Sequence, residues 1–494
     1  MDLLQVKGKN IVNSADEKVM LRGTCIGGWM NMENFINGYP GVESSLRLVM
    51  NEHSGRDMTD YFFNSMIDHF FGEDDIKFIR ETGANCVRLP LNYRHFEDDM
   101  TPFEYNEAGF ERLEKCVKMC EQAGLYVILD MHAVQGWQNA HWHSDNDRCV
   151  SLFWTHKHFQ DRLSALWCEL ARRYNGRAVI AGYNLMNEPA TGTPMGDYPH
   201  NFYENYRSNW TVINSVYKRL VDDIRKIDKK HIIFLEGDCY SYFFSGLDAP
   251  FADNLAYSSH NYTIAGFGPG AYPGEFVSYR ADRQHENGYW DIDRQRKMFL
   301  EHEGTKFSDK FNVPLWCGEF GSQYNTTPGD LPFRHAAMDD QLSVFNEFSA
   351  HWTTWTYKDV GVMSWVSLDP ESDYMRLIEP VQQMKNKLAA ENFVGWYNRS
   401  AGKEKAGEFA VLMSEIIGDP KLLPTSNTRC IITSLLTGYA AGALQPCYAK
   451  LFVGISKDRI DKIMESFSIK NCVKNEKFIS ILRKRLAEQT AKNT

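Results

Sequence analysis

The chain has 494 residues, of which 43% are hydrophobic and 24% charged, and its formal net charge is −10 at pH 7. This is the composition of a globular protein with ample length for a large core, and the negative charge disfavours a nucleic-acid partner. No apolar run reaches the roughly 18 residues that a membrane-spanning helix needs, so the sequence predicts no membrane partner.

The N-terminal stretch MDLLQVKGKNIVNSADEKV contains no basic segment followed by an apolar one, so no signal peptide is predicted. The 11 cysteines are scattered, and no two of them form a Cys-x-x-Cys pair. Several fall inside predicted strands or helices, which is typical of buried, reduced thiols. We therefore expect a cytoplasmic protein.

Short apolar runs alternate with amphipathic segments along most of the chain. The runs predict strands at Val19–Gly27, Ala84–Leu91, Leu125–His132, Val179–Glu188, His231–Gly237, Asn254–Tyr262, Val313–Gly321 and His351–Asp359. Most of these runs are almost continuously apolar in their first half, as parallel strands buried on both faces are. The segments between them have helical spacing; one of these segments places Phe110, Leu113, Val117 and Cys120 on one face.

Eight such strand–helix units predict a (β/α)8 TIM barrel, which we expect to occupy residues 1–387. An open, doubly wound sheet is the alternative. A glycine-rich phosphate fingerprint would be expected after the first strand of a nucleotide-binding sheet, and the sequence shows none there.

In a barrel of this kind the working residues lie where the strands end and the connections to the next helices begin. Long connections are predicted at residues 29–71, 133–155, 190–208 and 263–291. They carry five tryptophans, namely Trp29, Trp137, Trp142, Trp154 and Trp290. Each tryptophan could simply pack under its loop, but several on one face favour a flat-ringed ligand such as a sugar.

Beyond about Leu388 the pattern becomes helical, at residues 404–418, 429–452 and 456–469. In the last of these segments Ser456 is a candidate N-cap. An apolar stripe follows it, formed by Ile460, Ile463, Met464 and Phe467. We expect residues 388–494 to be a helical extension packed on the barrel, without catalytic groups. A surface for a partner or for a second copy of the chain is the alternative.

Polar residues gather where the predicted strands end. They are Arg88 with Pro90, Asp130 with His132, Asn187 with Glu188, His260 with Tyr262, Glu319, and Trp355 with Lys358. One such residue alone would be unremarkable, because strand-end carboxylates often cap helices. Their concentration at the same end of successive strands indicates a site, in which Glu188 and Glu319 would face each other across the barrel mouth.

Two facing carboxyl groups suit glycoside hydrolysis. One must be protonated to donate to the leaving oxygen, and the other must be ionised to attack the anomeric carbon or to activate water. Arg88 could keep one glutamate anionic, and Asn187 could hold the 2-hydroxyl of a sugar. His260 and Tyr262 could orient the nucleophile, and Trp355 could form a floor for a sugar ring.

Metal chemistry is the rival interpretation of the same region. The stretch HAVQGWQNAHWHSD contains His132, His141 and His143, with Asp145 close by. His-x-His on a strand is a metal-binding spacing, but here it falls in a predicted loop. A serine nucleophile is disfavoured because no Gly-x-Ser-x-Gly elbow occurs. We expect neither a metal nor a cofactor.

Taken in order, the motifs CVRLP, LDMH, NLMNEP, SSHNY, CGEFG and WTYK resemble those of the retaining (β/α)8 glycosidases of glycoside hydrolase family 5. The resemblance spans roughly Leu21 to Lys358. It implies that Glu188 is the acid/base and Glu319 the nucleophile. The residues that it places around the reacting sugar are Arg88, His132, Asn187, His260, Tyr262 and Trp355.

Within that family, LRGTCIGGWMNMENFI is similar to the LRGVNLGGWLVLEPWI pattern of exo-β-1,3-glucanases. By this likeness Glu33 would bind the terminal sugar in a closed pocket, and we include Trp29 among the substrate-binding residues. Asn34 replaces the usual proline after Glu33, and Val134-Gln135 replaces an Ala-Pro pair. The resemblance therefore predicts the mechanism better than the substrate.

We expect a retaining β-glycosidase that acts on a carbohydrate substrate from the chain end, on β-glucosides or short β-glucans. The two carboxyl groups would then lie about 5–5.5 Å apart. An endo-acting β-glucanase with an open cleft is the alternative within this class. Outside it, the alternatives are a sugar-binding barrel without catalysis and a scaffold whose partner, or second copy, binds the helical extension.

Overall fold

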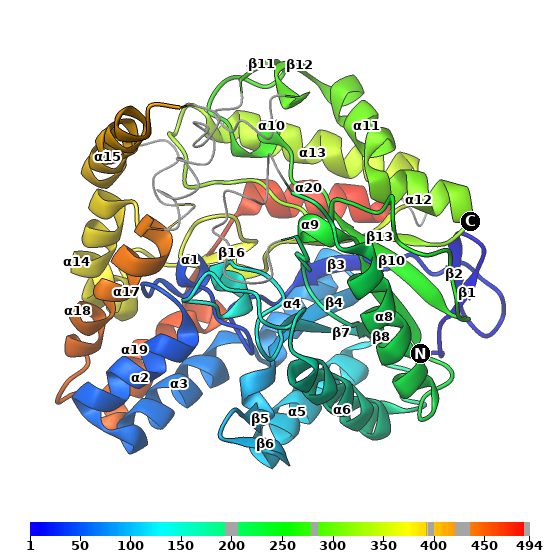
Figure 1. Cartoon of the computed structure of the whole chain (residues 1–494), viewed down its shortest axis with the longest axis horizontal. Helices are drawn as coiled ribbons and strands as arrows, with labels where there is room; N and C mark the ends of the chain where they lie inside the picture. The colour runs from blue at the N-terminus through cyan, green and yellow to red at the C-terminus, as the bar shows by residue number, and fades with distance from the viewer. Residues whose placement is uncertain (193–205, 278–284, 392, 394–399, 420–434, 489–494) are drawn as a thin grey trace.

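The computed structural model describes residues 1–192, 206–277, 285–391, 393, 400–419 and 435–488. The central strands are β3 (Arg22–Cys25), β4 (Cys86–Asn92), β7 (Tyr126–Ala133), β8 (Ile180–Asn184), β9 (Ile232–Glu236), β10 (Leu255–His260), β13 (Leu315–Glu319) and β14 (His351–Thr354). They pair in parallel in this order, and β14 returns to β3, so that the sheet closes into a barrel (Figure 1). Six of the strands lie within predicted ones, and β4 and β7 end one residue beyond theirs, so the (β/α)8 barrel is confirmed and the open sheet is wrong.

Helices surround the barrel, mostly where helical spacing predicts them. Those between barrel strands are α1 (Asn34–Asn37), α2 (Glu43–Ser54), α3 (Arg56–Phe70), α4 (Glu73–Thr82), α5 (Glu107–Ala123), α6 (Lys157–Tyr174), α8 (Trp210–Arg225), α9 (Asp238–Ser241), α10 (Ile264–Phe267), α11 (Ile292–Glu301), α12 (Glu303–Phe311) and α13 (Leu331–Glu347). In α5 the predicted apolar face is buried, the Asn106 side chain caps the first turn, and Gly124 ends the helix at a φ of 69°.

The end of the barrel where the strands begin is filled by apolar side chains. Strands β1 (Gln5–Lys7) and β2 (Asn10–Val12) form an antiparallel hairpin next to it. Leu4 and Ile11 from this region pack in one cluster with inward-facing strand residues, among them Phe234 and Trp316, whose ring centroids are 5.0 Å apart. The polar interior residues lie at the opposite end, where the strands finish, and that is the end available for chemistry.

Three further small sheets decorate the connections. They are β5 (Glu97–Asp98) with β6 (Thr101–Tyr105), β11 (Gly274–Phe276) with β12 (Gly288–Trp290), and β15 (Lys358–Asp359) with β16 (Val366–Leu368) and β17 (Cys472–Lys474). The predicted last strand therefore ends early, at Thr354. Lys358 does not lie at the barrel mouth: its buried Nζ donates to Asp75 Oδ1 at 2.7 Å and to the carbonyls of Phe70 and Phe467 at 2.6 Å each.

The predicted long connection over residues 29–71 joins β3 to α4, but it is not an irregular loop, because most of it is the helices α1, α2 and α3. Leu46 and Met50, four positions apart, point into the core and give α2 a buried face. Of the predicted loop over residues 190–208, residues 193–205 lie outside the described ranges.

After β14 the chain continues as α14 (Asp373–Leu388), and the C-terminal extension follows. Its helices are α15 (Ala401–Ile417), α17 (Ala441–Ala443), α18 (Gln445–Lys450), α19 (Lys457–Met464) and α20 (Glu476–Ala487), and a π-helical turn covers Leu435–Ala440. The Ser456 cap is confirmed, since its side chain accepts from the Arg459 N–H, and the predicted apolar stripe of α19 is buried. The extension is not purely helical, because β17 pairs antiparallel with β16.

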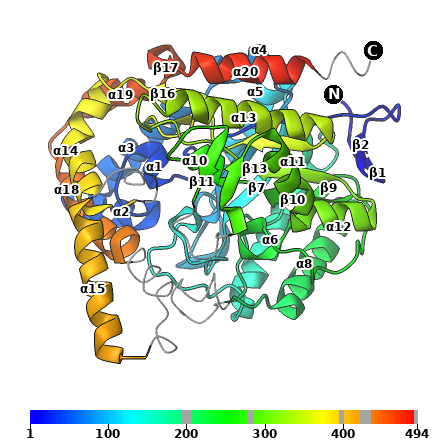
Figure 2. The same ribbon diagram turned by 90° about the horizontal axis from the view of Figure 1, so that it is seen from above.

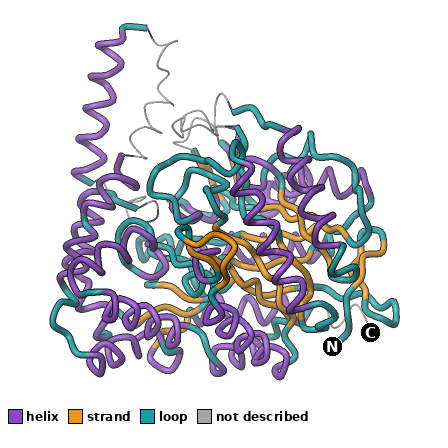
Figure 3. Tube along the Cα trace, turned by 60° about the horizontal axis from the view of Figure 1, so that its bottom comes forward, coloured by secondary structure: helices purple, strands orange, loops and turns teal. Residues whose placement is uncertain are grey.

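The extension packs on the barrel helices. Figure 2 shows α20 lying along α13, while α18 contacts α2 and α19 contacts α3. The Tyr61 hydroxyl of α3 donates to Asp461 of α19 at 2.6 Å, and the ring centroids of Phe62 and Phe452 are 4.7 Å apart. Helix α15 instead reaches away from the rest of the molecule (Figure 3). The division of the chain at residue 387 remains a prediction.

No helix within the described ranges is both long and apolar enough to cross a membrane. Cys25, Cys86 and Cys317, which fall in predicted strands, are buried and carry free thiols. This state agrees with the prediction of reduced cysteines.

Candidate active site

Three glutamates meet at the mouth of the barrel. Glu236 ends β9 and Glu319 ends β13, whereas Glu188 lies beyond β8, which ends at Asn184. The predicted fourth strand is therefore too long. Glu188 has a φ of 47°, a left-handed conformation that is uncommon outside glycine. Its backbone N–H donates to Glu236 Oε2 at 2.8 Å, and this bond holds the turned chain at the barrel mouth.

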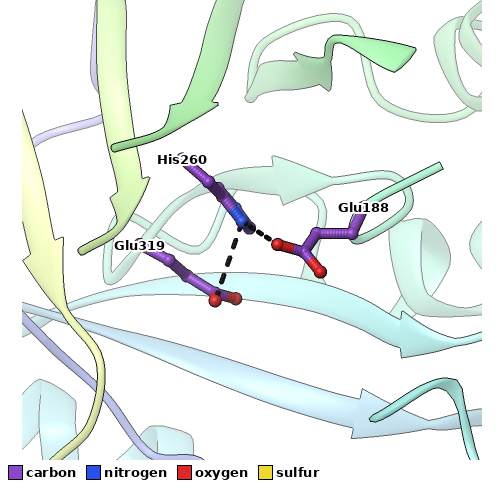
Figure 4. A group of neighbouring side chains, drawn as sticks. All are labelled: Glu188, His260 and Glu319. Carbon is purple, nitrogen blue, oxygen red and sulfur yellow. Dashed lines mark hydrogen bonds and ion pairs between the residues drawn. The ribbon is translucent and has the colours of Figure 1, made fainter. Parts of the chain in front are cut away.

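His260, the last residue of β10, lies between the two predicted catalytic carboxylates (Figure 4). Its Nδ1 is 2.6 Å from Glu188 Oε1 and 3.7 Å from Glu319 Oε2. The Tyr262 hydroxyl donates to Glu319 Oε2 at 3.0 Å. A carboxylate oxygen of Glu188 and one of Glu319 lie within 4.8 Å of each other. This spacing fits the roughly 5–5.5 Å of retaining glycosidases better than the 6.5–9.5 Å or so of inverting ones.

Arg88 lies under the site and is completely buried. Its guanidinium forms an ion pair with Glu319, and it lies 3.1 Å from Asp130 and 3.3 Å from Glu236. It also donates to Asn187 Oδ1 at 2.7 Å. A buried cation with three carboxylates around it is electrostatically paired, and it fixes the amide of Asn187 beside the glutamates.

The two glutamates have opposite protonation tendencies. Burial raises the pKa of Glu188 to about 7, although His260 opposes the shift. Burial would also raise the pKa of Glu319, but the positive charges of His260 and Arg88 outweigh burial and lower that pKa to about 2. Glu188 can therefore hold a proton near neutral pH while Glu319 stays ionised, which is the division of labour that acid and nucleophile need.

A second group of predicted residues lies on the β7 side of the mouth. His132 Nδ1 is 2.8 Å from Asp130 Oδ2, and its Nε2 is 3.5 Å from Glu33 Oε1. The Trp355 ring stacks on the His132 imidazole with centroids 5.2 Å apart and 4° between the planes. Burial by itself would lower the pKa of His132, but the negative charge of Asp130 has the larger effect and raises that pKa to about 9. The imidazole is therefore cationic at neutral pH.

A cavity of about 760 Å³ opens above these residues. Six of the predicted site residues line it: Glu33, His132, Glu188, Tyr262, Glu319 and Trp355. Arg88, Asn187 and His260 are fully buried and support the wall from behind.

Trp29 is not brought to this cavity. Its ring packs edge-on against Phe71 at a centroid distance of 6.0 Å, and it lines a separate, smaller cavity beside α3 and α4. An aromatic residue just after the first strand looks the same in the sequence whether it faces the mouth or the helices outside.

The loop histidines His141 and His143 line the cavity. His143 Nε2 lies 3.2 Å from Glu188 Oε2, and burial together with its positive neighbours keeps the pKa of His143 well below its usual range. His141 stacks on Tyr240 at 4.6 Å. Among the described residues, the group with metal-ligand spacing is Glu188, His260 and Glu319, so the predicted alternative set around His132 and Asp145 does not assemble.

Glu236 and Phe393 were not among the predicted site residues. Glu236 ends a correctly predicted strand, and its position at the same edge as Glu319 was the available signal. Phe393, which lines the cavity from beyond Leu388, follows no local pattern that marks it as a site residue.

The sequence was compared with known protein families and proteins. Residues 53–361 match the model of cellulase (glycosyl hydrolase family 5). A beta-xylosidase of Phanerodontia chrysosporium is 33% identical over 499 residues, which cover 98% of both proteins. Probable glucan 1,3-beta-glucosidase A of Aspergillus fumigatus is 23% identical over 71% of this chain and 85% of that protein. Endoglucanase C of Acetivibrio thermocellus is 24% identical over 60% of this chain and 87% of that protein.

The crystal structure of an endogalactoceramidase shares the fold, with a TM-score of 0.51 over 73% of this chain and 75% of that one, at 16% identity. The family match covers most of the barrel, and the beta-xylosidase matches along nearly the whole chain. The protein is therefore a glycosidase that belongs to glycoside hydrolase family 5.

Proposed function

We propose that the protein is a retaining β-glycosidase that releases sugars from the ends of β-glucosides or short β-glucans. The observation that carries this proposal is the pair of carboxylates within 4.8 Å of each other, one with its pKa raised and the other with its pKa lowered. A retaining enzyme needs both the short separation and the split in protonation.

In the first step, protonated Glu188 donates its proton to the glycosidic oxygen as the bond from that oxygen to the anomeric carbon breaks. Glu319 attacks the anomeric carbon from the opposite face and forms a glycosyl–enzyme ester. In the second step, Glu188 removes a proton from water, and the hydroxide displaces Glu319. Two displacements leave the sugar with its original configuration.

The surroundings of the two glutamates suit these steps. Arg88 and Tyr262 hold the Glu319 carboxylate in one orientation, through an ion pair and a hydrogen bond. Asn187, fixed by Arg88, is placed to contact the 2-hydroxyl of the reacting sugar, an interaction that strengthens in the transition state. The Trp355 ring in the cavity wall offers a flat apolar surface to the sugar.

Glu33 supports action at the chain end. Its Oε2 accepts a hydrogen bond from Trp142 Nε1 at 3.2 Å. Its Oε1 lies 3.5 Å from His132 Nε2 and makes no hydrogen bond within the described ranges, so it retains the capacity to accept one from a sugar hydroxyl. A carboxylate in the cavity wall close to the reacting sugar would bind hydroxyls that only a terminal residue leaves free.

The names of the relatives support two classes of substrate and one alternative mode of cleavage. One relative is named a beta-xylosidase and another a probable glucan 1,3-beta-glucosidase, so β-xylosides join β-glucosides as candidate substrates. A third relative is named an endoglucanase, and endo action on a β-glucan remains the alternative.

Aryl β-glucosides, aryl β-xylosides, linkage-defined disaccharides and β-glucan polymers separate these possibilities. We expect the wild type to release single sugars with retained configuration, which NMR detects in the anomer of the first product. Glu33→Ala should lose most of this activity. Cleavage of polymers to mixed oligosaccharides, with no action on aryl glycosides, would instead establish the endo mode. A first product of inverted configuration would contradict the retaining mechanism.

We also propose that the protein works in the cytoplasm, which the free buried thiols support. We propose as well that the chain self-associates through the extension, which is supported by exposed apolar side chains on α15, namely Phe409, Val411, Leu412 and Ile416. Light scattering over a range of protein concentrations tests it; a constant monomer mass would contradict it.

A further inference from the structure

The C-terminal extension reaches into the cavity of the glutamates. Phe393 lines that cavity, although it lies beyond the predicted end of the catalytic barrel. Its ring packs edge-on against Phe35 at 4.6 Å and against Trp142 at 6.4 Å, and it meets Phe267 of α10 at 6.2 Å. Phe35 follows Glu33 by two positions, and Trp142 donates to Glu33. The ring therefore spans the wall between the Glu33 side and the connection after β10.

The backbone of Phe393 is hydrogen-bonded to the segment that follows β13. Its carbonyl accepts hydrogen bonds from Gln323 Nε2 at 2.6 Å and from Asn325 Nδ2 at 3.2 Å. Both donors lie in the segment that follows Glu319 at the end of β13. The position of the ring is thus tied to the strand that carries the proposed nucleophile.

A buried cation ties the same segment to the helix after Glu33. Lys385 of α14 is fully buried and pairs with Glu391. Its Nζ also donates to the carbonyls of Asn34 at 3.1 Å and Tyr39 at 3.1 Å, on the helix α1 and just after it. One ammonium group therefore joins both parts of the chain that form the Glu33 end of the cavity.

Part of this end of the cavity lies outside the family's matched region. Residues 53–361 match the family model, whereas Glu33, Lys385, Glu391 and Phe393 lie outside it. The matched region carries the two glutamates, Trp142 and Phe267, whereas Glu33 and Phe393 reach the cavity from sequence before and after it.

We propose that Phe393 is a specificity-determining residue of the substrate pocket, and that the Lys385–Glu391 pair positions it. The ring closes the pocket beside Glu33 against longer glycans and presents an apolar face to the terminal sugar, whose C–H groups pack on aromatic rings. This inference rests on the proposed exo-glycosidase function and assigns the residue that limits chain length.

The test is Phe393→Ala, with Phe103→Ala as the matched control, because Phe103 is 46% exposed on β6 and does not line the cavity. For Phe393→Ala we expect KM for an aryl β-glycoside to rise about tenfold with little change in kcat, as for other lost apolar pocket contacts. Oligosaccharides of increasing length should become relatively better substrates. Phe103→Ala should leave both properties unchanged.

Unchanged KM and unchanged length preference in Phe393→Ala would overturn the proposal. A wild-type protein without activity on any β-glycoside would instead overturn the proposed function, so the two failures are distinguishable. Lys385→Met and Glu391→Gln test the positioning role: both should reproduce the KM rise, and Lys385→Arg should restore KM in part. A lower melting temperature with wild-type KM would mean that the pair is structural only.

Discussion

His260 Nδ1 lies 2.6 Å from Oε1 of Glu188, and the imidazole is completely buried. Burial alone would lower the pKa of His260, but the negative charges of Glu319, Glu236 and Glu188 raise it well above its usual range. The imidazolium in turn limits how far burial raises the pKa of Glu188, which settles at about 7. Glu188 is thereby poised to give up and regain a proton within one catalytic cycle.

The first prediction concerns the pH dependence of kcat/KM. Glu188 must be protonated and Glu319 ionised, so activity requires a pH below about 7 and above about 2. We expect kcat/KM to fall about tenfold per unit as the pH rises above about 7, because the fraction of protonated Glu188 falls in that proportion. In Glu188→Gln, with a dinitrophenyl glycoside whose leaving group needs no proton, this basic limb should disappear. A limb that persists in the variant belongs to another group.

The second prediction concerns the nucleophile. Glu319→Ala should lower kcat by roughly 1000-fold or more, because no group remains to form the ester. Added azide should restore turnover and yield a glycosyl azide of inverted configuration. Mass spectrometry after incubation of the wild type with a 2-fluoro glycoside should place the label on Glu319. Glu81→Ala, on an exposed part of α4, serves as the control and should retain full activity. A label on Glu236 would reassign the nucleophile.

The third prediction concerns His132 and stability. Its pKa is raised from 6.5 to about 9 in the folded protein, so the stabilising contribution is fully present below pH 6.5 and is lost as the pH rises through about 9. The unfolding free energy of the wild type relative to His132→Gln should therefore fall by about 3 kcal/mol between these limits. Urea unfolding at both pH values measures it. A difference that is independent of pH would show that His132 is neutral in the fold.

The fourth prediction concerns the attachment of the extension. Lys358→Met should lower the unfolding free energy by about 3–5 kcal/mol, because it leaves Asp75 buried without its cation and the Phe467 carbonyl without a donor. Lys457→Met removes a lysine whose ion pair with Asp57 is exposed and should cost about 0–1 kcal/mol. Denaturant unfolding of the two variants side by side measures the contrast. Equal losses would mean that the buried lysine contributes no more than a surface one.

Much of the fold could be predicted because parallel strands buried on both faces leave continuous apolar runs, and each run here became a barrel strand. Strand ends were less predictable. The chain leaves β8 at Asn184, and the left-handed turn at Glu188 depends on the hydrogen bond from its N–H to Glu236, a contact with another strand. Propensity along the chain carries no information about such a partner.

The site shows the same limit. Glu188 and Glu319 could be placed together because each lies at the end of a predicted strand, and parallel strands of a barrel all end at the same mouth. Trp29 could not be placed, because the side of the barrel wall that it faces is decided by its packing on Phe71. Phe393 could not be placed either, because its carbonyl is held by Gln323 and its segment by the ion pair of Lys385 with Glu391, and both contacts exist only after the chain has folded.

The bond between Tyr61 and Asp461 joins residues 400 positions apart. A ribosome adds about 5–20 residues per second, so α3 is made roughly 20 to 80 s before its partner helix. During that time Phe62 lacks two of its aromatic neighbours, Tyr448 and Phe452. The outer faces of α2 and α3 are thus left without α18 and α19 for most of synthesis, and they complete their packing only when translation is nearly over.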